Sequence, residues 1–197
     1  MIRYSMKHRF QIRLIVFSLL LFPELAFAHG FAGSGWLHPL TGIDHMCAMV
    51  AVGAWSAQIG GKAIWRVPAA FVTAMLIGGI IGFEHFILPA TEYGIVFSVF
   101  LLGIAIASEC RFGVLLASLG VGIFGLCHGY AHGVEMPTQD NKFSYAIGFI
   151  ITTAGLHLVG AIGGLLLLEE PKGRKTLRLL GACCTLVGVY LFYKLVR

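Results

Sequence analysis

The chain has 197 residues, of which 58% are hydrophobic and 12% are charged, with a formal net charge of +5 at pH 7. Soluble domains carry about a quarter of charged residues, so this composition excludes an ordinary soluble enzyme and indicates an integral membrane protein. The positive charge does not indicate a nucleic-acid partner, because it is concentrated at the N-terminus. The basic residues there are Arg3, Lys7, Arg9 and Arg13.

The first 28 residues have the layout of a secretory signal peptide. A basic start is followed by an apolar core from Leu14 to Phe22, and Ala26-Phe27-Ala28 then matches the A-x-A cleavage pattern. We therefore expect residues 1–28 to be removed, so that the mature chain begins at His29. An uncleaved anchor helix is the alternative interpretation.

Six apolar runs follow this leader, and each is long enough to cross about 30 Å of hydrocarbon as a helix. The runs cover residues 42–60, 67–88, 93–109, 112–133, 143–168 and 175–196. The connections between them leave no room for a soluble domain. The predicted fold is therefore an all-α membrane protein, with one six-transmembrane-helix bundle at residues 29–197 after the cleaved signal peptide. Small-xxx-small spacing, which allows helices to approach closely, occurs at Gly78 with Gly82, Gly129 with Gly133, and Gly160 with Gly164.

The basic residues of the mature chain are divided unequally between the two sides of this predicted bundle. With the mature N-terminus outside, the inner connections carry Lys62, Arg66, Arg111, Lys172, Arg174, Lys175 and Arg178. The outer segments carry only Lys142, Lys194 and Arg197. Cytoplasmic loops are enriched in Lys and Arg, and a signal peptide sends the following chain outward, so both arguments place both termini in the periplasm. The expected location is the bacterial cytoplasmic (inner) membrane.

A first polar cluster lies where the first apolar run begins, at His38, Asp44 and His45. His38 and His45 are close to two helical turns apart, so one continuous helix would place both on the same stripe. Ionisable side chains are costly to bury in a membrane and are therefore candidates for function. The alternatives are a capping box formed by Thr41 and Asp44, and an ordinary interfacial histidine at position 38.

A second cluster lies at the end of the fourth run, at His128, His132 and Glu135. These residues follow each other at helical spacing, so a continuing helix would place all three on one face. Pro137 predicts that this helix ends near Glu135. Neutral imidazole and carboxylate groups together suit divalent first-row transition metals.

Three further histidines are weaker candidates for metal ligands: His29, His85 and His157. His29 could bind an ion through a free terminal amine, whereas His85, next to Glu84, is also explained as a solvated helix end. His157 lies about 21 Å into the fifth run, near the middle of the membrane, where it could instead bond to a neighbouring helix. Met46 and Met49 are predicted to be packing residues rather than soft ligands.

Both clusters resemble the motifs of a known family. The H-x5-D-H signature of the HupE/UreJ family of bacterial nickel/cobalt permeases is matched by His38-Pro39-Leu40-Thr41-Gly42-Ile43-Asp44-His45. The family's second motif, HGxAHGxE, is matched from His128 to Glu135, although Cys127 stands where an aromatic or apolar residue is expected. The resemblance implies a role in metal uptake for His38, Asp44, His45, His128, His132 and Glu135. It also implies an indirect link to the maturation of hydrogenase or urease, or to cobalt enzymes.

The predicted function is transport of Ni²⁺ or Co²⁺ by a secondary or facilitated-diffusion permease, with the ion as cargo and no permanently bound cofactor. The sequence has no GxxxxGK[ST] phosphate loop, so this polypeptide is not expected to hydrolyse ATP, and no catalytic residue is assigned. The expected partners are the ion and the lipid bilayer, with a homo-oligomer possible. The alternatives are a membrane-embedded hydrolase with a His/Asp Zn²⁺ site and a b-type haem electron carrier.

Overall fold

The computed structural model describes residues 38–137 and 141–197, and for His38 and Pro39 only the backbone. The expected signal peptide and His29 lie outside the described residues. Within the described part the chain is helical and contains no strand. The helices are α2 (His38–Thr41), α3 (Ile43–Ile59), α4 (Ala63–Phe83), α5 (Thr91–Ala107), α6 (Val114–Val134), α7 (Lys142–Leu168) and α8 (Gly173–Leu195).

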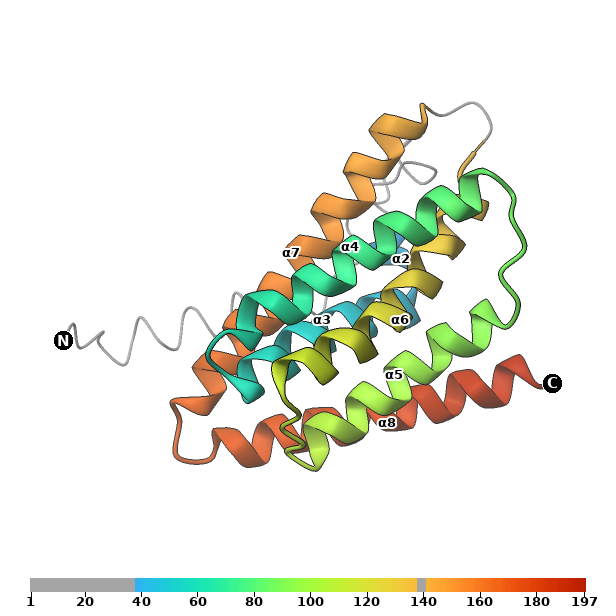
Figure 1. The fold of residues 1–197 in the computed structure, drawn as a ribbon. Coiled ribbons are helices and arrows are strands. Elements are labelled where there is room, and N and C mark those ends of the chain that lie inside the picture. The colour runs from blue at the N-terminus through green and yellow to red at the C-terminus, as the bar shows by residue number, and fades with distance from the viewer. Residues whose placement is uncertain (1–37, 138–140) are drawn as a thin grey trace, which may run out of the picture.

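The six long helices alternate in direction between two ends of one bundle (Figure 1). We call one the histidine end; it holds the starts of α3, α5 and α7 and the ends of α4, α6 and α8. The other, the basic end, holds the connections at residues 60–62, 108–113 and 169–172. In Figure 1, α4 lies beside α6 and α5 lies beside α8, and both pairs are in direct contact.

Helix α3 is the central helix of the bundle. It packs against α7, α5 and α4, and every residue from Ala51 to Gln58 is buried. A helix that is buried on all sides needs no polar face. Asp44 and His45 lie in the first turn of α3, at the mouth of the bundle, where His45 is buried and Asp44 is half-buried.

Glycines set the close contact of α6 with α4 and of α7 with α3, as their spacing predicted. A Cβ atom at Gly129 would collide with the backbone of Met75, and one at Gly160 would collide with the carbonyl of Val50. Only hydrogen fits at these two positions, so the backbones can approach each other as closely as membrane helices allow.

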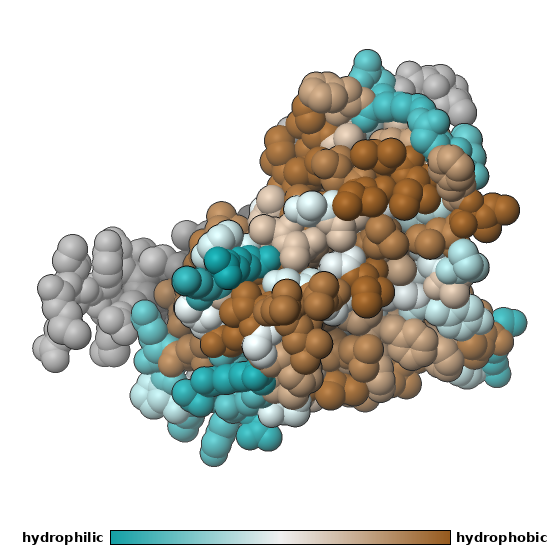
Figure 2. Space-filling view, viewed as in Figure 1, coloured by the Kyte–Doolittle hydropathy of each residue, from teal (hydrophilic) through white to brown (hydrophobic). Residues whose placement is uncertain are grey.

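The outside of the bundle is apolar, as expected for contact with lipid rather than water. Large side chains such as Leu115 and Leu186 are 75% and 68% exposed. Figure 2 shows hydrophobic surface along the helices, with hydrophilic groups gathered toward the ends. Among the described helices, α4, α6, α7 and α8 are long and apolar enough to cross a membrane, and α5 is apolar but shorter. The chain is thus an all-α membrane protein.

The second predicted span is displaced by about a turn. The helix runs over Ala63–Phe83 rather than 67–88, so Pro68 lies inside it. Proline leaves the carbonyl one turn earlier, that of Ile64, without its helical donor. The Ser56 hydroxyl lies 3.4 Å from that carbonyl, but it donates its proton to the nearer Gly53 carbonyl at 2.7 Å. At the other end the chain leaves the helix at Glu84 and His85, where φ of His85 is +56°. The other five predicted spans agree with the structure to within two residues.

Helix α3, which corresponds to the first predicted span, is not continuous with the residues before it. Gly42 has extended backbone, with φ −86° and ψ 116°, and separates α2 from α3. The expectation that one helix carries His38 and His45 on a single stripe is therefore wrong. Gly42, rather than Thr41, is the N-cap of α3, so the capping box starting at Thr41 is wrong as well.

Candidate metal site

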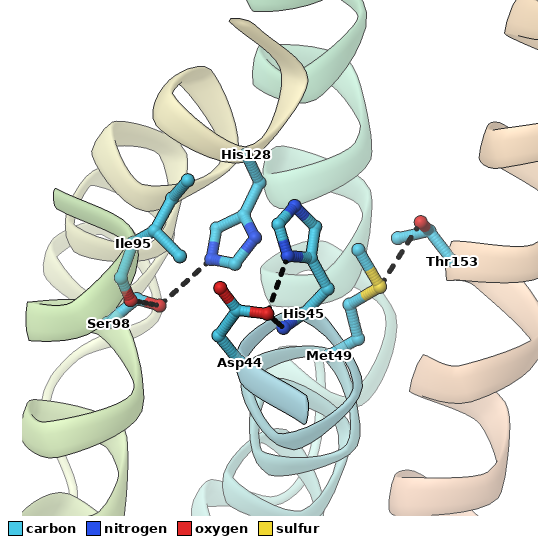
Figure 3. A network of polar contacts seen from close by, with 7 residues as sticks. All are labelled: Asp44, His45, Met49, Ile95, Ser98, His128 and Thr153. Atoms are coloured by element: carbon cyan, nitrogen blue, oxygen red, sulfur yellow. Dashed lines mark hydrogen bonds and ion pairs between the residues drawn. The ribbon is translucent and has the colours of Figure 1, made fainter. Parts of the chain in front are cut away.

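The carboxylate of Asp44 holds the imidazole of His45. Asp44 lies in the first turn of α3, where the helix dipole favours a negative charge. Its Oδ1 accepts a hydrogen bond from the His45 backbone N–H at 2.8 Å and lies 3.0 Å from His45 Nδ1. A carboxylate accepts, so Nδ1 carries the proton and Nε2 presents a lone pair. Figure 3 shows both side chains leaving the first turn of α3 toward His128.

His128 is held by a serine of α5 in a comparable way. Ser98 Oγ donates to the Ile95 carbonyl at 2.6 Å and lies 2.9 Å from His128 Nε2 (Figure 3). The hydroxyl has one proton and the carbonyl takes it, so Nε2–H of His128 donates to Oγ. The lone pair of His128 is then on Nδ1. That atom is buried and has no hydrogen-bond partner among the described residues.

Three imidazoles from two helices meet at this point. The ring centroids of His45 and His128 are 4.6 Å apart, and those of His45 and His132 are 4.8 Å apart. His132 also stacks on Phe149, with 5.0 Å between the ring centroids. The exposed fractions of His45, His128 and His132 are 6%, 0% and 0%. We call these three residues with Asp44 the imidazole cluster.

The rings of the imidazole cluster pack edge to face against each other. In residues 38–137 and 141–197, no three His, Cys, Asp or Glu side chains are arranged as a group that could hold a metal ion. An ion bound here would therefore require the rings to turn apart. The chemistry of the cluster, imidazole nitrogens backed by a carboxylate, is that of a site for a divalent transition metal.

The remaining predicted candidates lie elsewhere. Glu135 is the exposed C-cap of α6, directly beyond His132, so α6 ends where Pro137 predicted. His85 is exposed in the turn after α4, whereas the imidazole cluster is buried, so the structure does not bring His85 into it. His38 begins α2, and its side chain is outside the described part.

His157 lies deeper in the bundle, on α7. It is 3% exposed, and neither ring nitrogen has a hydrogen-bond partner within the described ranges. Its ring centroid is 5.0 Å from that of Phe71, which in turn lies 5.5 Å from that of His128. Phe71 therefore lies between His157 and the imidazole cluster.

Comparison with known proteins agrees with the family resemblance of the two sequence motifs, the one from His38 to His45 and the one from His128 to Glu135. The family described as "HupE / UreJ protein" matches residues 17–191. The chain belongs to the HupE/UreJ family. A relative named Protein HupE, from Rhizobium leguminosarum bv. viciae, is 41% identical over 174 residues, which cover 86% of this chain and 91% of the relative. No solved structure matches the chain.

In this HupE/UreJ chain, several side chains near the motifs are not predicted from the sequence. Ser98 belongs to no sequence motif. It comes to lie opposite His128 only because α5 packs beside α6. Glu92 interacts electrostatically with Glu135, Asp44 and His45. It was missed because the third span was expected to begin after it; its place in the first turn of α5, where carboxylates are favoured, is a signal that could have identified it.

Helix α3 also carries a buried glutamine, Gln58, near the basic end of the bundle. Gln58 is 3% exposed, and its Nε2 donates to the Ile106 carbonyl at 3.1 Å. Its Oε1 is buried and has no partner in the part of the chain that the structure describes. Helix α3 thus carries buried polar groups near both of its ends.

Proposed function

We propose that this protein is a permease that carries a divalent transition metal ion, Ni²⁺ or Co²⁺, across the cytoplasmic membrane without hydrolysing ATP. The observation that supports it most is the imidazole cluster, buried inside an apolar bundle near one end. Buried ionisable groups are expensive in a membrane and are retained for function. Membership of the HupE/UreJ family points the same way.

The ion would first meet negative charge at the histidine end. Glu92 lies close enough to Glu135 and to Asp44 to interact electrostatically with each of them, and a cluster of one sign of charge raises the local concentration of cations. The ion would then exchange water for the lone pairs of His45 Nε2 and His128 Nδ1. Because the rings of the cluster must turn to admit it, binding is moderate, and an ion that binds moderately can also leave. His38, whose motif position precedes Asp44, and His29 are proposed as earlier ligands.

Polar groups at greater depth favour a permease over a closed hydrolase site. A membrane hydrolase needs one metal position with access for water and substrate. Here His157 and Gln58 continue the series of buried polar side chains toward the basic end. This continuation supports a route across the bundle, with His157 as an inner position for the ion.

The topology we propose has all six long helices crossing the inner membrane, a signal peptide at residues 1–28 and both termini in the periplasm. The histidine end would then face the periplasm, where the ion enters. Helices α3 and α5 have 17 residues each, at the lower limit of the length that crosses a bilayer. The cargo would supply hydrogenase, urease or cobalt enzymes.

Uptake of radioactive nickel and cobalt into cells without their own importers tests the proposal. The wild type is expected to take up one of these ions, and His45→Ala, His128→Ala and His132→Ala are expected to lose that uptake. Wild-type cells that take up neither ion, while purified protein retains bound zinc, would contradict the permease and favour the hydrolase.

A further inference from the structure

Two methionines and a threonine from three helices meet in the core, at a depth between those of His45 and His157. Met49 of α3, Met75 of α4 and Thr153 of α7 are each 0% exposed. The Thr153 hydroxyl lies 3.3 Å from Met49 Sδ and 3.6 Å from Met75 Sδ. Figure 3 shows Met49 and Thr153 facing each other across the space between α3 and α7. We call these three residues the thioether group.

Helical register places this group at one level of the bundle. On α3, Met49 is one turn deeper than His45, and on α7, Thr153 is one turn shallower than His157. On α4, which runs the other way, Met75 is one turn shallower than Phe71, whose ring contacts both His128 and His157. The thioether group therefore lies one turn inward from His45 and one turn outward from His157. It is level with His128, because Gly129 packs on the Met75 backbone.

The Thr153 hydroxyl is directed differently from other threonine hydroxyls in these helices. A threonine inside a helix usually donates to the carbonyl one turn earlier. Thr73, Thr176 and Thr185 do so, with acceptors at Ala69, Lys172 and Gly181. Thr153 instead faces two sulfur atoms, so a buried oxygen and two thioethers converge on one point.

We propose that Met49, Met75 and Thr153 form an intermediate binding position through which a transition metal cation passes between the imidazole cluster and His157. This inference rests on the proposed transport function and deepens it. Thioether sulfur is a soft ligand and imidazole an intermediate one, whereas Mg²⁺ and Mn²⁺ prefer oxygen ligands. The thioether group thus selects against hard divalent cations inside the bundle, after the carboxylates at the histidine end have collected cations of every kind.

Sulfur-free variants test this position. Met→Leu nearly conserves volume and is tolerated in cores, so Met49→Leu with Met75→Leu removes the sulfur atoms with little change in packing. Nickel or cobalt uptake by the double variant is expected to fall about tenfold, the lower end of the effect of losing a supporting group at a metal site. Binding of radioactive nickel to the purified variant is expected to persist, because the imidazole cluster is intact. Met46→Leu, the same change on the same helix outside the group, is the matched control.

Thr153 provides an independent variant of the group if the double variant does not reach the membrane. Thr153→Val removes the hydroxyl with little change in shape and is expected to reduce uptake, whereas Thr153→Ser keeps the hydroxyl and is expected to restore much of it. Membrane levels of each variant are compared by immunoblot.

The possible outcomes separate this inference from the proposed function. If the wild type transports the ion and the double variant, present at the same level, transports it as well as Met46→Leu, the thioether position is wrong and the permease stands. Equal uptake by Thr153→Val and Thr153→Ser would also overturn it. If the wild type transports neither nickel nor cobalt, the proposed function fails and this inference fails with it.

Discussion

Two hydrogen bonds decide which nitrogen of each central histidine can bind a metal. Asp44 holds the proton on Nδ1 of His45, and Ser98 accepts the proton on Nε2 of His128. The two residues therefore present opposite ring nitrogens, although their rings lie edge to face at 4.6 Å. Partners of this kind orient a ligand and raise its basicity.

Replacing Asp44 by Asn tests the first of these bonds. The amide keeps the shape of the side chain but removes the charge that favours the proton on His45 Nδ1. Nickel affinity of the purified protein, measured by equilibrium dialysis, is expected to fall about 10- to 100-fold. Glu84→Gln is the control, because Glu84 is an exposed carboxylate paired with Lys142 at 3.4 Å, and such pairs contribute little. Equal affinities of the two variants would contradict the role of Asp44.

Replacing Ser98 by Ala tests the second bond. Without the hydroxyl, His128 Nε2–H loses its acceptor and the proton is no longer confined to that nitrogen. We expect nickel affinity to fall about tenfold, the lower end of the range for a group that supports a ligand. Ser108→Ala, on the segment directly after α5, serves as the control. It removes a hydroxyl whose hydrogen bond, within the described residues, is to the Ile104 carbonyl of its own chain segment. An affinity that does not differ between the two variants would show that Ser98 does not orient His128.

At the scale of elements, the pair of α4 and α6 positions half of the imidazole cluster. Gly129, next to His128, packs on the backbone of Met75, so the glycine that permits this contact adjoins the ligand. The positions of the His128 and His132 rings inside the bundle therefore depend on how closely the backbones of α4 and α6 approach each other.

Gly129→Ala is expected to destabilise the protein, because the added Cβ would collide with the Met75 backbone. Overpacking typically costs about 1–3 kcal/mol, so the unfolding temperature in detergent should fall. Gly155→Ala is the matched control, since a Cβ there would meet no atom within 4 Å. Alanine is the better helix former by about 1 kcal/mol, so this control should be neutral or stabilising. A Gly129→Ala protein that unfolds at the temperature of the wild type would refute the close packing.

The parts of this arrangement that could be predicted are those with a local signal. Spacing within α6 predicted that His128 and His132 share a face, and the apolar runs predicted the helices. Gly42 has such a signal too, because glycine commonly interrupts a helix, but the two-turn spacing of His38 and His45 favoured one helix across it. The partner Ser98 could not be predicted, because its role depends on which helices become neighbours. Met49 was predicted to be a packing residue, because the sequence does not show that Met75 and Thr153 lie beside it.

At the scale of the whole molecule, the alternation of the six helices places the start of α3 and the end of α8 at the same end of the bundle. If every helix crosses the membrane, the C-terminus and the imidazole cluster share the periplasmic side. The basic end would then hold the cytoplasmic connections, where Arg174 pairs with Glu109 at 3.4 Å.

Reporter fusions test this topology. Alkaline phosphatase is active only where its disulfides form, in the periplasm. A fusion after Arg197 is expected to be active, and a fusion after Pro171, between α7 and α8, is expected to be inactive. Activity of the second fusion but not of the first would reverse the orientation and place the imidazole cluster at the cytoplasmic face.

The most direct test of the transport route uses purified protein in lipid vesicles that contain no ATP. Radioactive nickel or cobalt is added outside, and the ion inside the vesicles is counted over time for the wild type and for His128→Ala. Accumulation faster than in protein-free vesicles, lost in His128→Ala, is the predicted result. Wild-type vesicles that admit neither ion faster than empty vesicles would contradict the account.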